Sequence, residues 1–349
     1  MTPLEALERV VYLMDRSLAE PNKVNAFRNA AAVVAELPPG EVESRVAAGT
    51  LTDLPGIGAS TGKVIAQAVA GGIPERIVDL EATTQVPLSA AGARYREALR
   101  GDCHSHSFWS DGSASIEQMA RTAIELGHDY LVLTDHSPRL TVAHGLNAER
   151  LREQLSEIAF LNERLAPFRV LTGIEVDILE DGSLDQDPDL LARLDIVVAS
   201  AHSKLRMDRP SMTRRLVLAV ASPPVDIQGH CTGRKLRSTV AQVASDTEIV
   251  RPESQFDPEL VFAACARFDT AVEINCRPER QDPPDPLLEL ALEWNCKVAI
   301  DTDAHAPGQL EWQAFGCDKA ARHEIAIDDI VNTWAADELV EWAAAHPTG

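Results

Sequence analysis

The stretch DCHSHSFWSDG, residues 102–112, sets a His-x-His pair at the end of a predicted β-strand. Residues two apart on a strand point to the same side, so the rings of His104 and His106 can reach one ion. Asp303 and His305 repeat this spacing at the end of the last predicted strand. Neutral imidazole and ionised carboxylate are usual ligands of divalent metals. The stretch therefore predicts a metal site at the end of a strand.

From residue 101 onward, short β-type runs alternate with amphipathic helical runs. Seven such βα units in succession predict a parallel sheet, closed or nearly closed into an α/β barrel. An open doubly wound sheet is the competing architecture. The predicted strands are Asp102–His106, Tyr130–Asp135, Val170–Ile178, Ile196–Ala201, Val225–His230, Ala271–Asn275 and Val298–Asp303. The clearest helical runs are Ile116–Gly127, Ala148–Ala166, Met212–Ala221 and Pro258–Phe268.

Six of the ten histidines lie at or just past the end of a predicted strand, together with several carboxylates. In a parallel barrel the C-terminal ends of all strands meet at one face, so these side chains become neighbours. So much imidazole and carboxylate, crowded together without cations, would repel or have strongly shifted pKa values. Bound divalent ions resolve this, and the pattern predicts a multi-metal hydrolytic centre. Its members are His104, His106, His136, His202, His230, His305, Asp111, Asp135, Glu175, Asp301 and Asp303.

The first 100 residues have a different pattern, a series of short helices with turn residues between them. We therefore expect two domains, a small all-α domain over residues 1–90 and the barrel over residues 100–345. The predicted helices of the first domain are Pro3–Ala19, Val24–Leu37, Val42–Ala48 and Thr61–Ala70.

The net charge of −22 comes from 54 acidic and 32 basic residues. Residues 1–100 hold 12 acids and 10 bases, so they contribute −2 and residues 101–349 contribute −20. Nucleic-acid binders are normally basic, and this balance disfavours tight non-specific binding. It does not exclude an enzyme that acts on DNA ends, because the acidity lies in the predicted metal-binding part.

The six cysteines form no C-x-x-C pair, which is typical of reduced, buried thiols in a cytoplasmic protein. No apolar stretch reaches the roughly 18 residues of a membrane span, and the N-terminus lacks the apolar core of a signal peptide. We expect a cytoplasmic protein with no membrane partner, and a monomer.

Seven motifs in order resemble the polymerase and histidinol phosphatase (PHP) superfamily, above all the PHP domain attached to bacterial family X DNA polymerases. The resemblance runs from about residue 100 to about residue 340, and it implies a distorted (β/α)7-type barrel. The motifs are DCHSHSxxSDG (102–112), LTDHSP (133–138), GIEVDI (173–178), SAHS (200–203), GHCTGR (229–234), EINCRPER (273–280) and DTDAH (301–305).

The N-terminal domain carries its own resemblance. LPGIG (54–58) is similar to a helix-hairpin-helix, and residues 21–31 are similar to the preceding segment in polymerase β relatives. Such a hairpin presents backbone N–H groups to a nucleic-acid phosphate without reading sequence. Family X polymerases carry palm and finger subdomains between these two parts, and the junction near residues 80–100 leaves no room for them. The position of the Schiff-base lysine of the polymerase β lyase falls on Val64, so the resemblance does not imply lyase activity of that kind. The implied DNA-contacting residues are Gly56, Ile57, Gly58 and Lys63.

The resemblance implies nine ligands for three divalent ions, manganese or zinc, with iron as a further candidate. The first ion would be held by His104, His106, Glu175 and Asp303. The second would be held by His202, His230 and a bridging Glu175. The third would be held by Asp111, His136 and His305.

Further residues follow the same motifs. Lys204, Arg234 and Arg277 are expected to clamp substrate phosphates and to act with Glu175 and Asp303 in catalysis. Asp135 and Asp301 are expected to support the ligands, and His144 is a weaker candidate for the site. Glu273 is expected to be structural, because its strand supplies no ligand. The remaining histidines, His128, His323 and His346, are expected to be exposed or capping residues.

The implied function is a metal-dependent DNA phosphoesterase of repair type, a 3′→5′ exonuclease or 3′-end-processing enzyme at ends, gaps or nicks. A hydroxide held by the ions would attack the phosphodiester. A small-molecule phosphatase of the histidinol-phosphate type is the alternative. A DNA-docking module with a vestigial metal site is a third hypothesis, which the complete ligand set disfavours.

Overall fold

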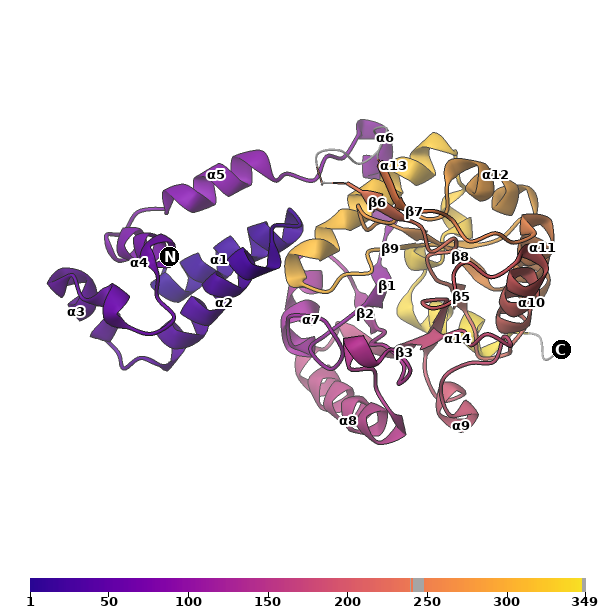
Figure 1. The fold of residues 1–349 in the computed structure, drawn as a ribbon, viewed down its shortest axis with the longest axis horizontal. Helices are drawn as coiled ribbons and strands as arrows, with labels where there is room; N and C mark the ends of the chain where they lie inside the picture. The colour runs from indigo at the N-terminus through magenta and orange to yellow at the C-terminus, as the bar shows by residue number, and fades with distance from the viewer. Residues whose placement is uncertain (239, 241–247, 347–349) are drawn as a thin grey trace. The chain divides into compact units, whose positions relative to one another are not determined.

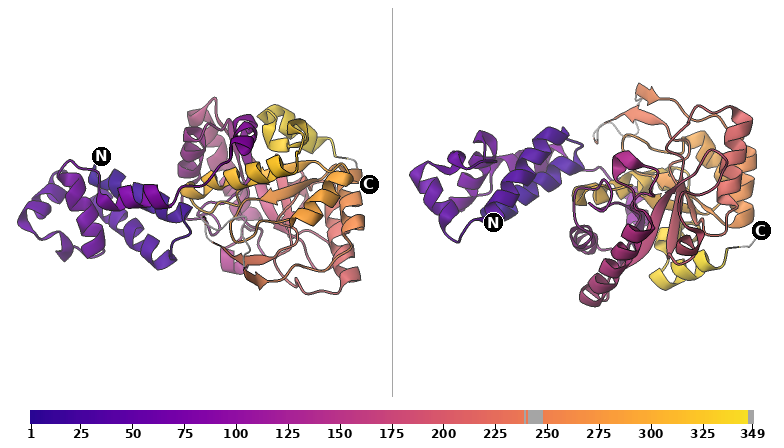
Figure 2. Two further views of the ribbon diagram at one scale, coloured as in Figure 1. Left: turned by 90° about the horizontal axis from the view of Figure 1, so that it is seen from above. Right: turned by 60° about the horizontal axis from the view of Figure 1, so that its bottom comes forward.

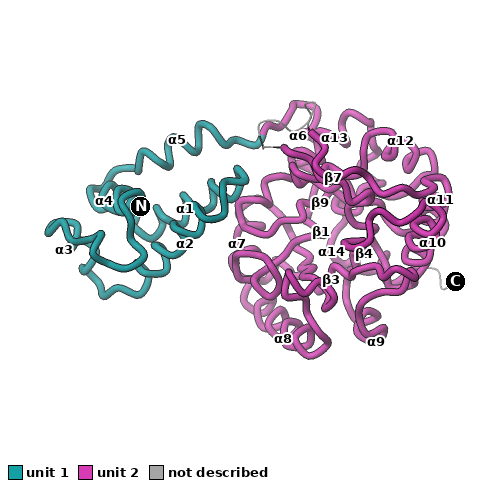
Figure 3. Tube along the Cα trace, in the orientation of Figure 1, with its two compact units in different colours: residues 1–86, 239–241 teal, residues 87–238, 242–349 magenta. Residues whose placement is uncertain are grey.

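The computed structural model describes residues 1–238, 240 and 248–346, and the chain divides into two compact units. Met1–Val86 belong to the first unit, and the second begins at Pro87 (Figure 3). The helix that follows Pro87, α6 (Ala90–Ala98), therefore belongs to the second unit.

The first unit is all helical. Thr2 caps its first helix by accepting a hydrogen bond from the N–H of Glu5. The second helix begins earlier than predicted, at Pro21, because proline fits the first turn of a helix. Its core includes Leu13, Phe27 and Ile65. The elements are α1 (Pro3–Arg16), α2 (Pro21–Glu36), α3 (Glu41–Ala48), a 3-10 turn (Leu51–Asp53), α4 (Ala59–Val69) and α5 (Glu75–Thr83), the last of which was not predicted.

The second unit contains seven parallel strands in the order β1-β2-β3-β4-β5-β8-β9 (Figure 1). Ser105 and Ala304 bridge the two edges, and the N–H of His106 donates to the carbonyl of Ala304 at 2.8 Å. The sheet is therefore a nearly closed barrel, which confirms the predicted fold over the open sheet. The strands are β1 (Gly101–Ser105), β2 (Tyr130–Leu133), β3 (Arg169–Asp177), β4 (Ile196–Ser200), β5 (Ile227–Gln228), β8 (Ala271–Asn275) and β9 (Val298–Asp301).

Helices lie around the strands of this unit (Figure 2). The strands are buried on both faces, as in other parallel sheets, and Val197 and Val272 pack with Leu216 and Phe262 of the helices. All four predicted helical runs are helices. The helices are α7 (Ile116–Glu125), α8 (Ala148–Leu165), α9 (Pro188–Leu191), α10 (Arg209–Val220), α11 (Pro258–Phe268), α12 (Asp285–Glu293), α13 (Gln313–Arg322) and α14 (Ala336–Ala344). Short 3-10 turns occupy Thr141–Ala143, Pro307–Trp312, Ile327–Asp329 and Val331–Thr333.

Two further strands, β6 (Lys235–Arg237) and β7 (Glu248–Arg251), form an antiparallel ribbon outside the barrel. This ribbon was not predicted, because both strands are short and rich in charge. None of the helices in the described ranges has the length and apolar character that a membrane crossing needs.

Candidate metal centre

All nine predicted ligands lie at the C-terminal ends of the barrel strands or in the loops that follow. The backbone of β1 places His104, and His106 follows one residue beyond its end. Glu175 lies near the end of β3, and the other histidines come two or more residues after their strands. The parallel topology therefore brings residues up to about 200 positions apart to one place.

Glu175 is the centre of this group, and its side chain is 1% exposed. Five imidazole rings surround its carboxylate. The distances to its oxygens are 3.4 Å from His104 Nε2, 3.6 Å from His106 Nε2, 2.8 Å from His136 Nδ1, 3.2 Å from His202 Nε2 and 2.7 Å from His230 Nε2.

Two more carboxylates complete the group. Asp303 Oδ1 lies 3.5 Å from His106 Nε2. Asp111 Oδ1 lies 3.3 Å from His305 Nε2 and 3.5 Å from His136 Nε2. The structure thus brings the nine residues into one continuous network. Three sets among the described residues could each hold an ion, and they share His106, His136 and Glu175: His106, Asp111, His136 and His305; His104, His106 and Glu175; His136, Glu175 and His202.

Several buried atoms of this network make no hydrogen bond, including Nε2 of His104, both ring nitrogens of His106 and Oε2 of Glu175. A buried polar atom without a partner costs about 1–3 kcal/mol. Imidazole nitrogens and carboxylate oxygens aimed at common points are the donor set of divalent ions. The residues therefore fit bound divalent metal.

The carboxylates are held in the ionised form that metal binding needs. Burial alone would raise the pKa of Glu175, but the surrounding imidazoles, His202 first, hold that pKa well below its usual value. Burial also opposes ionisation of Asp303, and the nearby ring of His106 and the charge of Arg277 keep its pKa well below the usual value.

Two parts of the chain match known protein families. Residues 102–232 match the model described as PHP domain, and residues 2–73 match the model described as helix-hairpin-helix domain. The chain carries a PHP domain preceded by a helix-hairpin-helix domain.

Relatives include the Bacillus subtilis protein named DNA polymerase/3'-5' exonuclease PolX, 38% identical over 234 residues. The match covers 67% of this chain but only 39% of that protein. A Thermoanaerobacter protein named "Probable phosphatase" is 27% identical over 250 residues, which is 68% of this chain and 88% of the relative.

A solved structure of histidinol phosphate phosphatase from Lactococcus lactis, complexed with zinc, L-histidinol and phosphate, is 18% identical. It covers 64% of this chain and 92% of that one, with a TM-score of 0.43. This similarity is too low to support an inference about function.

Two carboxylates that were not predicted as site residues orient ligands of the PHP domain. Glu273 Oε1 lies 2.5 Å from Nδ1 of His104, and its other oxygen accepts the N–H of His230. Asp177 Oδ1 lies 3.3 Å from Nδ1 of His202. The expectation that Glu273 is merely structural was wrong, because its strand supplies a partner to a ligand rather than a ligand. Glu175 and Asp177 lie two residues apart on one strand, so they point to the same side. This spacing is a sequence signal from which Asp177 could have been predicted.

Asp135 and Asp301 lie behind the ligands. Asp135 accepts hydrogen bonds from the N–H and hydroxyl of Ser107, at 2.8 and 2.7 Å, and from Gln154. It thereby holds the loop that carries Asp111. Asp301 accepts the N–H of Cys103, next to His104, at 2.8 Å. Both carboxylates therefore bond to backbone next to predicted ligands.

A cleft of about 270 Å³ opens over the cluster. The side chains of Asp111, His136, His202, Asp303 and His305 line one part of it. Leu140, Glu279 and five cations, Arg234, Lys235, Arg251, Arg277 and Arg280, line the rest.

The cations of the cleft differ in what they contact. Arg277 Nη1 donates to the carbonyl of Asp303 at 2.9 Å, and Arg280 Nε donates to the Oδ2 atom of Asp303 at 3.1 Å. Arg280 was not predicted as a site residue, although it ends the EINCRPER motif. Arg234 donates to the carbonyls of Arg280 and Gln281, so it braces this loop. Lys204 is exposed and does not line the cleft, so the geometry does not support the phosphate clamp predicted there.

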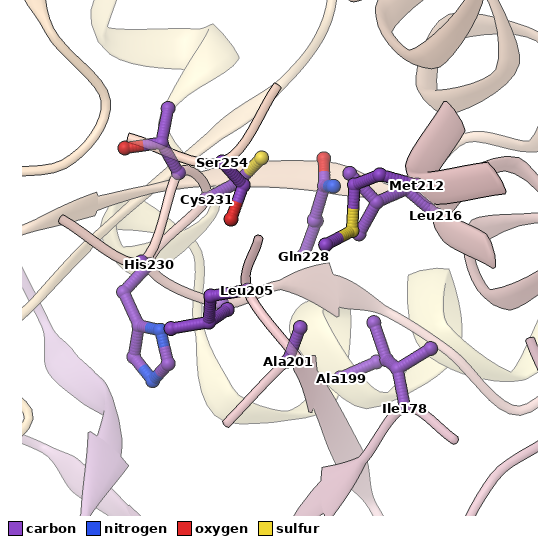
Figure 4. A pocket seen from close by; sticks show the side chains of 13 residues that line it. Ile178, Ala199, Ala201, Leu205, Met212, Leu216, Gln228, His230, Cys231 and Ser254 are labelled. Carbon is purple, nitrogen blue, oxygen red and sulfur yellow. The ribbon is translucent and has the colours of Figure 1, made fainter. Parts of the chain in front are cut away.

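A much smaller cavity, of about 10 Å³, lies behind His230 (Figure 4). Gln228 and Ser254 line it together with apolar side chains such as Leu205 and Met212. It has room for roughly one water molecule, which excludes it as a substrate site.

Of the histidines expected to be exposed or capping, His323 is the C-cap residue of α13, whereas the side chains of His128 and His346 are largely buried. His128 is buried, and its Nε2 lies 3.2 Å from Arg96 Nη2. The side chain of His346 is 3% exposed, with its Nε2 2.9 Å from Asp226 Oδ1. His323 lies 3.5 Å from Asp285. His144 has a positive φ of 55° and does not line the cleft.

The hairpin of the helix-hairpin-helix domain lies between the 3-10 turn and α4. Gly56 has a φ of +91°, which requires glycine. The N–H of Ile57 donates to the carbonyl of Leu54, and the N–H of Gly58 donates to Thr61 Oγ1, so both bond inside the turn. Lys63 pairs with Glu75 at 2.6 Å on the surface. Of the four predicted DNA-contacting residues, Gly56, Gly58 and Lys63 are exposed, whereas Ile57 is buried.

Proposed function

We propose that the protein is a metal-dependent DNA phosphoesterase that removes nucleotides from 3′ ends at breaks, gaps or nicks. The PHP domain and the relatives named phosphatases support the coarse class, hydrolysis of phosphate esters. The observation that carries the finer proposal is the cation-lined cleft over the His and carboxylate cluster, in a chain that also has a helix-hairpin-helix domain.

The nine residues of the cluster are the proposed ligands of three divalent ions, manganese or zinc. When bound, such ions supply the Lewis acidity that activates water and offsets the charge of a phosphate. The chain's own cations add to this. Arg277 and Arg280 lie against Asp303 and line the cleft, so their guanidinium groups are placed to pair with oxygens of the reacting phosphate.

The helix-hairpin-helix domain is the proposed DNA-docking part. Its glycine turn is exposed beside the first turn of α4, whose leading N–H groups have no acceptor within the helix and could donate to a phosphate. Such contacts read no base sequence, which agrees with action at DNA ends of any sequence. The six cysteines are free and buried, as in proteins of the cytoplasm, where we place the reaction of a monomer.

The test is release of 3′ nucleotides from gapped DNA in the presence of manganese or zinc. We expect the native protein to release them and His104→Ala to lose this activity. His323→Ala, which changes a histidine outside the cleft, should retain it. Equal activity of the native protein and His104→Ala, or inactivity of both, would contradict the proposal.

A small-molecule phosphatase is the second candidate, because a relative named phosphatase is matched over 88% of its length. A substrate of the histidinol-phosphate type carries an amine, and the cations of the cleft disfavour such a group. Steady turnover of histidinol phosphate with no action on DNA would select this alternative.

A further inference from the structure

Lys235 and Arg251 stand directly opposite each other on the two strands of the β6–β7 ribbon. Both side chains line the cleft over the metal cluster. Like charges directly opposite on neighbouring strands destabilise a ribbon. The juxtaposition therefore favours an anion between them.

The protein itself supplies little neutralisation at this place. Lys235 Nζ lies 3.6 Å from Glu279 Oε1, and the lysine side chain is half exposed. Arg251 donates through Nε to the carbonyl of Gly233 at 2.7 Å. Among the residues that the structure describes, no carboxylate pairs with Arg251, so its terminal nitrogens remain available to a ligand.

The cleft contains two groups of cations, one beside the metal cluster and one on the ribbon. Arg277 and Arg280 are tied to Asp303, which is part of the metal cluster, whereas Lys235 and Arg251 belong to the ribbon. Arg234 adds no free charge, because Asp282 Oδ1 lies 3.6 Å from its Nε and Glu253 Oε1 lies 3.8 Å from its Nη1. A substrate with one phosphate would satisfy the group beside the cluster and leave the ribbon pair unpaired.

We infer that the ribbon pair, Lys235 and Arg251, binds a second phosphate of the same DNA strand, next to the phosphate that is cleaved. The inference rests on the proposed function and defines its substrate: a strand with at least one phosphodiester on the 5′ side of the scissile bond. It assigns a role to a ribbon that lies outside the barrel.

The experiment compares two substrates of the metal-loaded protein. The dinucleotide dTpdT has only the scissile phosphate, and the trinucleotide dTpdTpdT has one more on its 5′ side. For the native protein we expect kcat/KM for the first cleavage of the trinucleotide to exceed that of the dinucleotide about ten- to hundredfold, the effect of one charge-assisted contact. Lys235→Gln and Arg251→Gln should each bring this ratio toward one.

Arg237→Gln is the matched control. Arg237 lies on the same ribbon, pairs with Glu248 and does not line the cleft, so its loss should leave the ratio at the native value. A second measurement needs no turnover: binding of a labelled trinucleotide in the presence of a chelator, as a function of salt. The plot of the logarithm of the binding constant against the logarithm of the salt concentration has a negative slope. In Arg251→Gln this slope should become shallower by about 0.7, the value of one single-strand phosphate contact.

The outcomes separate the two proposals. Equal efficiency on both substrates, or an unchanged ratio and salt slope in Arg251→Gln, overturns the second-phosphate site while leaving a phosphodiesterase in place. Hydrolysis of phosphate monoesters with no cleavage of either oligonucleotide or of gapped DNA overturns the proposed function, and the second-phosphate site with it.

Discussion

Oε1 of Glu273 lies 2.5 Å from Nδ1 of His104, and neither side chain is exposed at all. The other ring nitrogen of His104 points toward Glu175, at 3.4 Å. A carboxylate behind a ligating histidine fixes the orientation of the ring and increases its basicity. The two residues are 169 positions apart, so the metal centre depends on the register of the whole barrel.

Replacement of Glu273 should therefore weaken the metal site without removing a ligand. We expect Glu273→Gln to lower the affinity for divalent ions about 10- to 100-fold. Titration of the metal-free protein with manganese or zinc measures this. Glu293→Gln, an exposed change on α12, is the control, and an affinity equal to that of the control would refute the role of Glu273.

Removal of metal should destabilise the PHP domain, because the network around Glu175 is left with buried atoms that make no hydrogen bond. An ion present at 100 times its Kd adds about 2.7 kcal/mol to stability. For a unit of this size, a chelator should then lower Tm by about 5–10 °C. Glu175→Gln should show a much smaller change on chelation, and a chelator effect as large as in the native protein would count against Glu175 as the central ligand.

Gly58 offers a test of the DNA-docking turn. A Cβ built on Gly58 meets nothing within 4 Å, so alanine fits the fold but projects toward an approaching phosphate. Gly58→Ala should weaken binding of gapped DNA about two- to tenfold, the value of roughly one hydrogen bond. Gly72→Ala, where the added methyl makes only an ordinary contact, should bind like the native protein. Fluorescence anisotropy measures both, and equal affinities would exclude the turn from the interface.

Asp15 should make the stability of the helical unit depend on pH. Burial raises its pKa from 3.8 to about 6, although Arg28 donates to both carboxylate oxygens at 2.7 and 2.6 Å. A raised pKa means that the folded state keeps a proton that the unfolded state loses. The contribution of Asp15 to the free energy of unfolding is thus greatest below pH 4 and falls as pH rises to 6, by about 3 kcal/mol at 1.36 kcal/mol per unit.

Hydrogen exchange of the buried amides of α1 and α2 measures this locally. Asp15→Asn should remove that part of the pH dependence, whereas Asp79→Asn, an exposed change on α5, should retain it. The same pH profile in Asp15→Asn and the native protein would show that Asp15 does not titrate in this range.

The barrel and its candidate ligands could be predicted from the sequence because both follow from local patterns. Short buried strands alternate with amphipathic helices, and a parallel topology brings the ends of such strands together. The spacing of His104 and His106, or of Asp303 and His305, then places two side chains on one side of the backbone. Prediction failed where a residue's role depends on a distant partner. Glu273 was judged by its own strand, and the contact of His346 with Asp226 was not foreseen.

By itself, the sequence determined that the chain has a helical domain and a parallel barrel, and that nine histidines and carboxylates meet at one face. Only the tertiary structure decided that Glu273 and Asp177 orient histidines, that Arg280 contacts Asp303 and that Lys204 does not line the cleft. It also decided that Lys235 faces Arg251 across an unpredicted ribbon. The physical reason is that periodicity sets which side of a strand a residue occupies. Contacts between side chains instead depend on strand register and loop packing, which distant parts of the chain determine together.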